Sequence, residues 1–348
     1  MFVAAGMVLT SSAQQTDKQV ATLQHGDQTS VFYGVNAFKQ AYDAAADTLD
    51  VITLSSGEFN VPNPISKSIA VYGAGFEDDA ITGVERTYLN SYLSLKHADT
   101  QDGDGNTIKA GRRVNGVHIE GVYVNGSMYV DNNNDEPIHN LSVIKCRLSS
   151  ISFKADCYDC VVRQSVVSAS GAVGVSAGQD GVQAHNLLIA NSYVYASGGN
   201  LFVPNSTILV DHCVLSGHGI QGPFRYTNNI CEDWTRQAGS VYSNNIFIST
   251  SGTSTTATID GSWYNMRDLA VWAAEGEDGK YAEDKDFALK YPERYIGTDG
   301  TEIGLHGGVY AWNKIPSIPR ITECSIDTKE VNKGTLKVSI KAEAQNKE

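Results

Sequence analysis

A repeated segment of about twenty residues is the feature that most restricts how this chain folds. The clearest copies are "YTNNICED" (226–233) and "YSNNIFIS" (242–249), which begin sixteen residues apart and each place two asparagines before an apolar stretch. Similar segments stand upstream, at 117–124, 142–149, 161–168, 188–195 and 209–216. Successive copies are separated by 25, 19, 27, 21, 16 and 16 residues, so the period is irregular but lies near twenty.

The aligned copies share a column of small or hydrogen-bonding residues and, two positions later, a mostly apolar column. The first column holds Gly121, Cys146, Ser165, Ser192, Cys213, Asn229 and Asn245, and the second holds Tyr123, Leu148, Val167, Val194, Leu215, Cys231 and Phe247. Period-two alternation predicts strands, and the connections are too short and polar for crossover helices. Strands that recur in this way predict a parallel β-helix, in which each turn of the chain stacks on the last.

Two further expectations follow from this alignment. The residues next to the first column should face outward; they are Glu120, Lys145, Gln164, Asn191, His212, Asn228 and Asn244. Asn229 should lie over Asn245 as a short asparagine ladder, because identical amides about 4.8 Å apart can hydrogen-bond along the stack. The asparagine pairs are therefore best explained as structural.

Composition and charge narrow the choice of partner. The 348 residues carry 33 glycines against 8 prolines and a formal net charge of −13, which argues against nucleic acid as a partner. We expect no membrane span, because no stretch approaches the roughly 18 apolar residues needed. Residues 1–15 resemble the end of a secretory signal, which predicts a secreted, periplasmic or cell-surface protein.

The remaining chain divides into a long repeat region and a tail. Residues 16–320 are assigned to the β-helix, with a helix at about 34–47 that covers its open end, because Val35, Phe38 and Tyr42 recur at helical spacing. Residues 321–348 are assigned to a strand and tail. The alternating Leu336, Val338 and Ile340 predict a strand that either packs along the last turns or begins a lost or processed extension.

Both ends of the repeat region resemble a known superfamily. "AFKQAYDAAADTLDVITLSSGEFNVPNPISKSIAVYGAGFEDD" is similar to the opening of right-handed parallel β-helix proteins of the pectin-lyase-like superfamily. "DGKYAEDKDFALKYPERYIGTDGTEIGLHGGVYAW" (278–312) resembles the closing turn of secreted and surface β-helix proteins of Bacteroidetes, although "KYPERY" stands where those carry a Ser-Pro-Ala segment. The resemblance spans about 30–312. It implies a right-handed β-helix, whereas activity varies across the superfamily.

The cysteines have structural interpretations. Cys146, Cys213 and Cys231 fall on inward columns and should be small buried residues. Cys157 and Cys160, in "DCYDC", are placed in a loop, where they could form a tight local disulfide or remain free thiols. Neither a zinc nor a redox pattern accompanies them.

A polysaccharide lyase is one enzymatic alternative. Such an enzyme needs a base beside a uronate and a cation or metal that neutralises its carboxylate. The outward-facing candidates are Lys145, Arg147, Arg163 and His212, with Arg225 and Arg236 farther along. A glycoside hydrolase would need two carboxylates about 5–9.5 Å apart. Asp180, Asp211 and Asp233 include no matching pair, so elimination is favoured over hydrolysis.

Metal sites are weakly indicated. Asp102, Asp104 and Asn106 have the alternating spacing of a calcium loop, but Thr107 and Arg113 replace its glycine and closing glutamate, so a looser calcium site is the only form left open. His185, His212 and His218 fit no structural zinc spacing.

The leading interpretation is an exported protein that binds or scaffolds a polysaccharide or surface glycan. Tyr193, Tyr195 and Trp234 are candidates for stacking on sugar rings. The alternatives are a lyase acting on an acidic glycan and an adhesive solenoid that contacts another protein. The sequence leaves the oligomeric state open.

Overall fold

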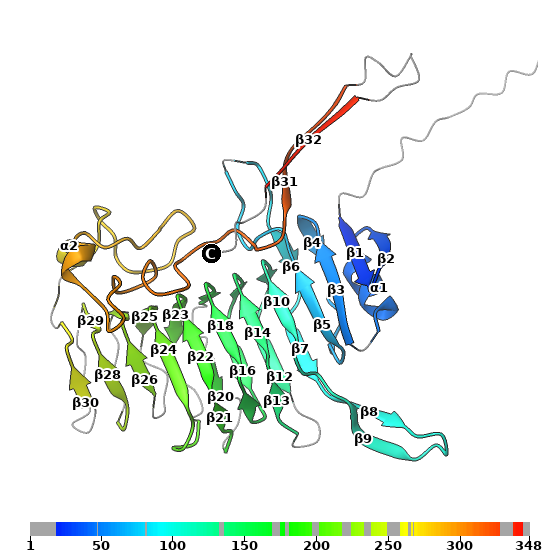
Figure 1. Ribbon diagram of the computed structural model, residues 1–348, viewed down its shortest axis with the longest axis horizontal. Coiled ribbons are helices and arrows are strands. Elements are labelled where there is room, and N and C mark those ends of the chain that lie inside the picture. The colour runs from blue at the N-terminus through cyan, green and yellow to red at the C-terminus, as the bar shows by residue number, and fades with distance from the viewer. Residues whose placement is uncertain are drawn as a thin grey trace, which may run out of the picture.

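The fold is all-β, built mostly from parallel strands in long stacked sheets (Figure 1). The structure is a computed structural model, which describes residues 19–46, 48–80, 82–131, 136–168, 175–177, 181–196, 202–217, 224–232, 238–248, 258–263, 266, 268–327 and 337–343. The long stacked sheets are compatible with the β-helix or solenoid that the repeat predicts.

Four sheets make up the body. The twelve-stranded sheet contains, in spatial order, β2 (Gln28–Tyr33), β1 (Val20–His25), β3 (Thr48–Leu54), β5 (Ser68–Tyr72), β10 (His118–Glu120), β14 (Ser142–Ile144), β18 (Val161–Arg163), β22 (Leu187–Ala190), β24 (Ile208–Asp211), β26 (Arg225–Thr227), β28 (Val241–Ser243) and β30 (Thr258–Asp260). The nine-stranded sheet contains, in spatial order, β29 (Ile246–Phe247), β27 (Ile230–Glu232), β25 (Val214–Gly217), β23 (Tyr193–Ala196), β19 (Val166–Val167), β15 (Arg147–Leu148), β11 (Tyr123–Val124), β6 (Thr87–Leu89) and β4 (Gly57–Phe59).

Two shorter sheets complete each repeat. The four-stranded sheet contains β20 (Val175–Ala177), β16 (Ile151–Phe153), β12 (Met128–Asp131) and β7 (Leu93–Lys96), and the three-stranded sheet contains β13 (Ile138–His139), β17 (Cys157–Tyr158) and β21 (Ala184–His185). One repeat thus passes from β14 through β15, β16 and β17 before it returns to the twelve-stranded sheet at β18. Each copy of the sequence motif spans the corner between the two largest sheets.

The strand register corrects the first copy of the alignment. Tyr123 pairs with Arg147, so Val122 lies level with Cys146, and Gly121 belongs one position earlier. Val124 consequently points inward, at 1% exposure, in place of Tyr123. The slip arose because Gly121 matched the small residues of the column, although its positive φ of 72° identifies it as a corner residue.

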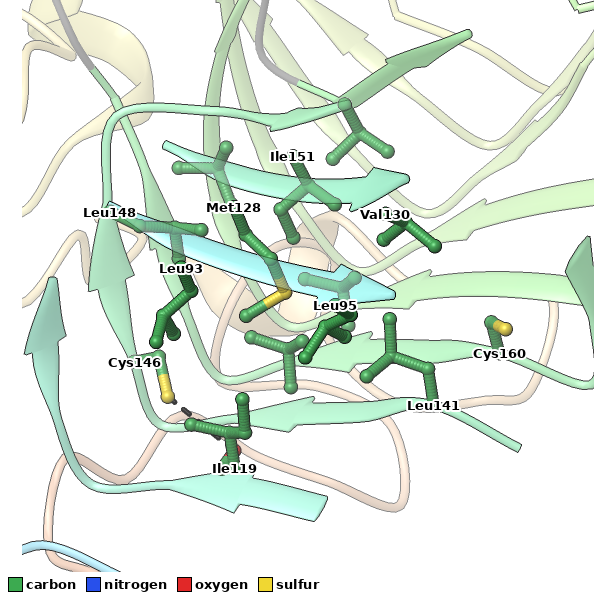
Figure 2. Close-up of a cluster of buried hydrophobic side chains, with 14 of the residues drawn as sticks. Leu93, Leu95, Ile119, Met128, Val130, Leu141, Cys146, Leu148, Ile151 and Cys160 are labelled. Carbon is green, nitrogen blue, oxygen red and sulfur yellow. Dashed lines mark hydrogen bonds between the residues drawn. The ribbon is translucent and has the colours of Figure 1, made fainter. Parts of the chain in front are cut away.

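Inward-facing side chains from all four sheets form one continuous core. Figure 2 shows part of it, where Leu93, Met128 and Ile151 stack from neighbouring strands of the four-stranded sheet. Cys146 joins this cluster, with its Sγ 3.5 Å from the carbonyl oxygen of Ile119. Burial of such contiguous apolar columns provides most of the driving force for the fold.

The N-terminal end is covered by a helix, as the sequence predicts. The helix α1 (Ala37–Ala44) is shorter than expected, because the chain is already extended at Ala45. Its inner face is fully or nearly buried and consists of Ala37, Phe38, Ala41 and Tyr42. The antiparallel strands β1 and β2 close the same end of the twelve-stranded sheet (Figure 1).

Two antiparallel hairpins project from the body (Figure 1). One is β8 (Ala98–Gln101) with β9 (Thr107–Arg112). The other is β31 (Arg320–Asp327) with β32 (Lys337–Glu343). The tail strand therefore pairs with residues 320–327, and the prediction that it packs along the last turns is wrong. The alternation in 336–342 predicted a strand, but it carried no information on which strand would be its partner.

Of the two alternatives for Cys157 and Cys160, a local disulfide or free thiols, the structure has the second. Both are free thiols and are 0% and 1% exposed. Cys157 belongs to β17, where it pairs with Ile138 and Ala184, so it is a core residue of a strand and not part of a loop. The intervening Asp159 has a φ of 53° and turns the corner of the chain. Small size in a tight corner explains these cysteines.

Candidate functional site

The corner between the twelve- and nine-stranded sheets has a left-handed backbone conformation in each repeat from β10 to β30. Its residues have φ between 43° and 59°: Lys145, Gln164, Asn191, His212, Asn228 and Asn244. Gly121 and Gly261 take the equivalent positions at the two ends, with φ of 72° and 63°. Asparagine recurs here because it tolerates the left-handed conformation that a sharp corner requires. This is one physical reason for the first asparagine of each pair.

The second asparagine of each pair belongs to an inward ladder. The amide of Asn229 donates to Asn245 Oδ1 at 3.0 Å, and Asn245 Oδ1 also accepts the backbone N–H of Asn229 at 2.9 Å. Asn229 Oδ1 in turn accepts the N–H of Cys213 at 2.8 Å. Ser165 and Ser192 play the same role for the N–H groups of Cys146 and Ser165. The polar column thus satisfies buried N–H groups that follow each corner.

The corner residues point out of the core, as predicted, but most of them are not exposed to solvent. Five of them are at most 5% exposed: Lys145, Gln164, Asn191, His212 and Asn228. They point out of the core, but residues 296–317, hereafter the strap, run across them in the direction opposite to the stacking of the repeats. A covering segment from far along the chain is invisible to an analysis of single repeats.

Corner side chains hold the strap by donating to its backbone. Asn244 Nδ2 donates to Ile296 O at 3.0 Å, and Asn191 Nδ2 donates to Leu305 O at 2.9 Å and Gly307 O at 2.8 Å. Further along, Gln164 donates to Ala311 O and Lys145 donates to Ile315 O, each at 2.6 Å. Glu120 accepts the N–H of Ser317 at 2.6 Å. The strap is therefore fixed at nearly every repeat.

The glycine-rich motif "GTDGTEIGLHGG" forms part of the strap. A Cβ on Gly307 would lie 2.6 Å from the His212 ring, and one on Gly297 would lie 2.8 Å from the Asn228 amide. Glycine lets the strap backbone approach the corner side chains this closely. The most specific part of the resemblance is thus explained by packing.

A second apolar cluster covers the outer face of the nine-stranded sheet. It joins Val166, Val214, Ile230 and Ile246 of the sheet to C-terminal residues that include Phe287, Leu289 and Leu305. Figure 1 shows this C-terminal segment, with α2 (Asp268–Val271), along the top of the stacked sheets. This face is therefore unavailable to a ligand over these repeats.

The aromatic candidates for sugar stacking do not form a surface platform. Tyr193 is 2% exposed, because its ring packs against Tyr281 and Phe287 at centroid distances of 5.4 and 5.5 Å. Its proposed role in sugar stacking is therefore wrong. Tyr195 is half-buried against the same cluster. Trp234 lies outside the described residues, as do His218, Asp180, Asp233 and Arg236.

The basic residues proposed for a lyase are each engaged in a different place. Lys145 binds the strap, and Arg147 pairs with Glu283 while its guanidinium lies 4.8 Å from the Tyr123 ring. Arg163 stacks over Tyr310 at 4.2 Å. Arg147 is on the nine-stranded sheet and Arg163 is on the twelve-stranded sheet. The corner at Lys145 and Gln164 therefore lies between the two arginines, and each of the three cations contacts a different partner.

The fourth lyase candidate, His212, is 1% exposed beneath the strap. Its Nδ1 lies 3.0 Å from Asp211 Oδ2, at an angle that does not give a well-aligned hydrogen bond. Its Nε2 lies 3.2 Å from Thr301 Oγ1 and 3.6 Å from Asp299 Oδ2. His212 therefore links a strand carboxylate to the strap, and it has no direct access to a substrate.

One pocket, which we call the groove site, lies between the twelve-stranded sheet and the strap. Its volume is about 580 Å³. Leu188 and Leu209 pair across neighbouring strands and form an apolar floor, and Arg225 follows them in register. Asp211, Thr227 and Asn228 line the side nearest the corner, and the strap adds Thr298 and Asp299. The sheet and the strap thus contribute opposite walls.

Hydrogen bonds preorganise the polar wall of the groove site. Asp211 Oδ1 accepts from Thr227 Oγ1 at 2.6 Å and from Asn228 Nδ2 at 2.9 Å. Asn228 also accepts the N–H of Thr298 at 2.8 Å. Burial by itself would raise the pKa of Asp211, but the nearby His212 and these hydrogen bonds outweigh it and lower the pKa below its ordinary value of 3.8. Asp211 is therefore an anion at neutral pH.

Arg225 supplies the positive charge of the groove site. It is exposed, and within the described part of the chain it forms no ion pair. The site therefore combines the Arg225 guanidinium, the carboxylates of Asp211 and Asp299, and an apolar floor. Of these, only Asp211 and Arg225 stood out in the sequence. Asp299 and Thr298 lie about seventy residues downstream of Asn228, and only their motif "GTDGT" marked them as unusual.

No metal centre is evident where the structure describes the chain: it contains no group of three or more His, Cys, Asp or Glu side chains placed to hold an ion. In the suspected calcium loop, Asp102 accepts the N–H groups of Asp104 and Asn106 and the Asn106 amide. These bonds form a self-contained turn.

Comparison with known proteins finds no match among family models, curated proteins or solved structures. Over the residues that the structure describes, every helix is too short or too polar to cross a bilayer.

Proposed function

We propose that the protein is an exported right-handed parallel β-helix, of the pectin-lyase-like kind, that binds a glycan in the groove site. The repeat register, the long parallel sheets and the N-terminal helix support this fold. The signal-like residues 1–15 support export. The proposal of a glycan ligand rests on one observation, the composition of the groove site.

A saccharide is the ligand that this composition suits. Sugar rings present apolar C–H faces and a rim of hydroxyl groups. Leu188 and Leu209 offer a flat apolar floor of matching character. Asp211 and Asp299 can accept from hydroxyl groups, and Arg225 can donate to ring or hydroxyl oxygens. A volume of about 580 Å³ accommodates a short oligosaccharide.

Binding, and not catalysis, is the better-supported activity. The proposed lyase cations are separated and engaged, and His212 is covered by the strap. The polar wall is held rigid by Thr227 and Asn228, so a bound sugar would meet hydrogen-bonding groups that need no reorganisation.

The test is a glycan array of neutral and acidic oligosaccharides, followed by calorimetric titration of the best ligand. Arg225→Ala and Asp299→Ala should each weaken binding by about 10- to 100-fold, the usual effect of losing a charged hydrogen bond. Lys39→Ala is a matched control, because Lys39 is an exposed cation on α1. Its affinity should equal that of the unaltered protein.

Three outcomes would overturn the proposal. A folded protein that binds no glycan would point to an adhesive role. Release of unsaturated uronate, seen by ultraviolet absorbance during the titrations, would establish a lyase. Undiminished affinity in both groove variants would place the glycan elsewhere on the protein.

A further inference from the structure

A second pocket lies where the nine-stranded sheet ends, and we call it the end pocket. Its volume is about 380 Å³, and its lining residues are Trp263, Met266, Ala270, Tyr291, Arg294 and Tyr295. None of the lining residues that the structure describes carries a carboxylate. The groove site, by contrast, has two.

The aromatic wall of the end pocket is rigidly held. Trp263 extends the nine-stranded sheet by pairing with Ile246, and its N–H donates to Asn245 O at 2.8 Å. Its carbonyl accepts the N–H of Phe247 at 2.8 Å. The Tyr295 ring meets the Trp263 ring edge to face, at 5.5 Å and 86°. Because Tyr295 is itself buried, at 6% exposure, this contact restricts the orientation of the indole ring.

Arg294 gives the end pocket a positive charge. Arg294 ends the short helix η1 (Pro292–Arg294), and its guanidinium carbon lies 5.3 Å from the centre of the Tyr291 ring. Lys290 Nζ lies 5.8 Å from the same ring. Arg294 is exposed and forms no ion pair with any residue that the structure describes. On a chain of net charge −13, an aromatic pocket whose described lining residues supply an arginine and no carboxylate is a distinct local environment.

We propose that the end pocket binds a sugar residue that carries an anionic substituent, a carboxylate or a sulfate. The aromatic side chains would pack on the C–H face of the ring, and Arg294 would pair with the anion. The Tyr291 ring already orients the guanidinium, so little side-chain freedom is lost on binding. This inference deepens the proposed glycan-binding function, on which it rests, but it needs none of the groove residues.

The experiment is a calorimetric titration at low salt with three probes of matched length: a tetragalacturonate, a sulfated tetrasaccharide and a neutral tetrasaccharide. Arg294→Ala should weaken binding of an anionic probe by about 10- to 100-fold and leave the neutral probe unchanged. Arg294→Lys should recover only part of that loss, because lysine keeps the charge but not the fork geometry. The uronate and sulfate arms identify which anion is preferred.

Lys39→Ala is the matched control, since it removes an exposed cation from α1 that lines neither pocket, and its anionic binding should equal that of the unaltered protein. Arg225→Ala distinguishes the two sites: anionic binding that falls more in Arg294→Ala than in Arg225→Ala supports the end pocket, even if the groove proposal fails. Anionic binding that is lost in Arg225→Ala and kept in Arg294→Ala would refute the end pocket. Failure of both anionic probes to bind the unaltered protein would refute it as well. Because Arg294 is exposed, its variants should fold normally, which a circular dichroism melt checks.

Discussion

Replacing Asn191 should release the middle of the strap. Asn191 is 2% exposed, and its amide donates to the carbonyl oxygens of both Leu305 and Gly307. It also holds a left-handed corner, with φ of 43°. Asn191→Ala would therefore remove two buried hydrogen bonds and place a residue without asparagine's local preference in a strained conformation. Asn191→Gly would remove the same bonds without the backbone strain.

The expected cost follows from these two contributions. Each buried hydrogen bond contributes about 1 kcal/mol net, so the pair contributes about 2 kcal/mol. The left-handed conformation adds about 1 kcal/mol for alanine and little for glycine. Asn140 provides the matched control, because it has a φ of 56° at an exposed corner that the strap does not cover. Asn140→Ala should cost about 1 kcal/mol, and Asn140→Gly should be nearly neutral.

Hydrogen exchange followed by mass spectrometry measures the loss of stability in the strap itself. A loss of about 2 kcal/mol corresponds to roughly 30-fold faster exchange of the strap amides around 303–312 in Asn191→Gly. Neither Asn140 variant should change that segment. If Asn191→Gly left strap exchange unaltered, the hydrogen bonds would contribute nothing to docking, and the corner side chains would not be what anchors the strap.

Three other predictions concern the core and its charges. Asn245→Ala should lower the free energy of unfolding in urea by about 3–5 kcal/mol, because it leaves a buried N–H and two buried carbonyls without partners. Asn245→Ser should lower it less, and equal losses for the two variants would contradict the ladder. Cys157 and Cys160 should resist alkylation in the folded protein and react at once on unfolding without reductant; persistent protection would indicate a disulfide. Burial would raise the pKa of Glu120, but its contacts with His118 and Ser317 outweigh this and lower the pKa, and the pKa of Asp211 is lowered as well. Both carboxylates therefore stabilise the fold above about pH 4, and this stabilisation is lost as the pH falls through their lowered pKa values. Thermal midpoints of Glu120→Gln should therefore fall less between pH 5 and pH 3 than those of the unaltered protein, and an unchanged slope would disprove this role.

Much of the stacked body could be predicted from local patterns. Strands in parallel sheets bury one face, so the buried pairs Leu187 with Ile189 and Ile208 with Val210 are each spaced two residues apart and mark the core side of their strands. Gly121 misled the alignment by one position because small size is shared by corner and core residues. The sequence could not show that Cys157 lies on a strand, since two-residue strands are too short to have a period.

The candidate sites were much harder to predict. Asp211 and Arg225 could be noticed, but nothing in the repeat places Asp299 beside them, and the rings of the end pocket come from segments about thirty residues apart. Tyr193 showed the opposite error: an aromatic on an outer face looked available, yet residues of the C-terminal segment cover it.

By itself the sequence determined the repeat, its inward columns and the asparagine ladder, because these depend on contacts between equivalent positions one period apart. Only the tertiary structure decided what happens outside the core. The strap returns along the corners, buries Lys145 and His212, and creates the groove site by standing beside the twelve-stranded sheet. Its bonds to Lys145 and Asn191 join residues 170 and 114 positions apart through backbone carbonyls, which every residue carries. A hydrogen bond to a backbone carbonyl places no requirement on the type of the accepting residue, so no sequence pattern predicts these contacts.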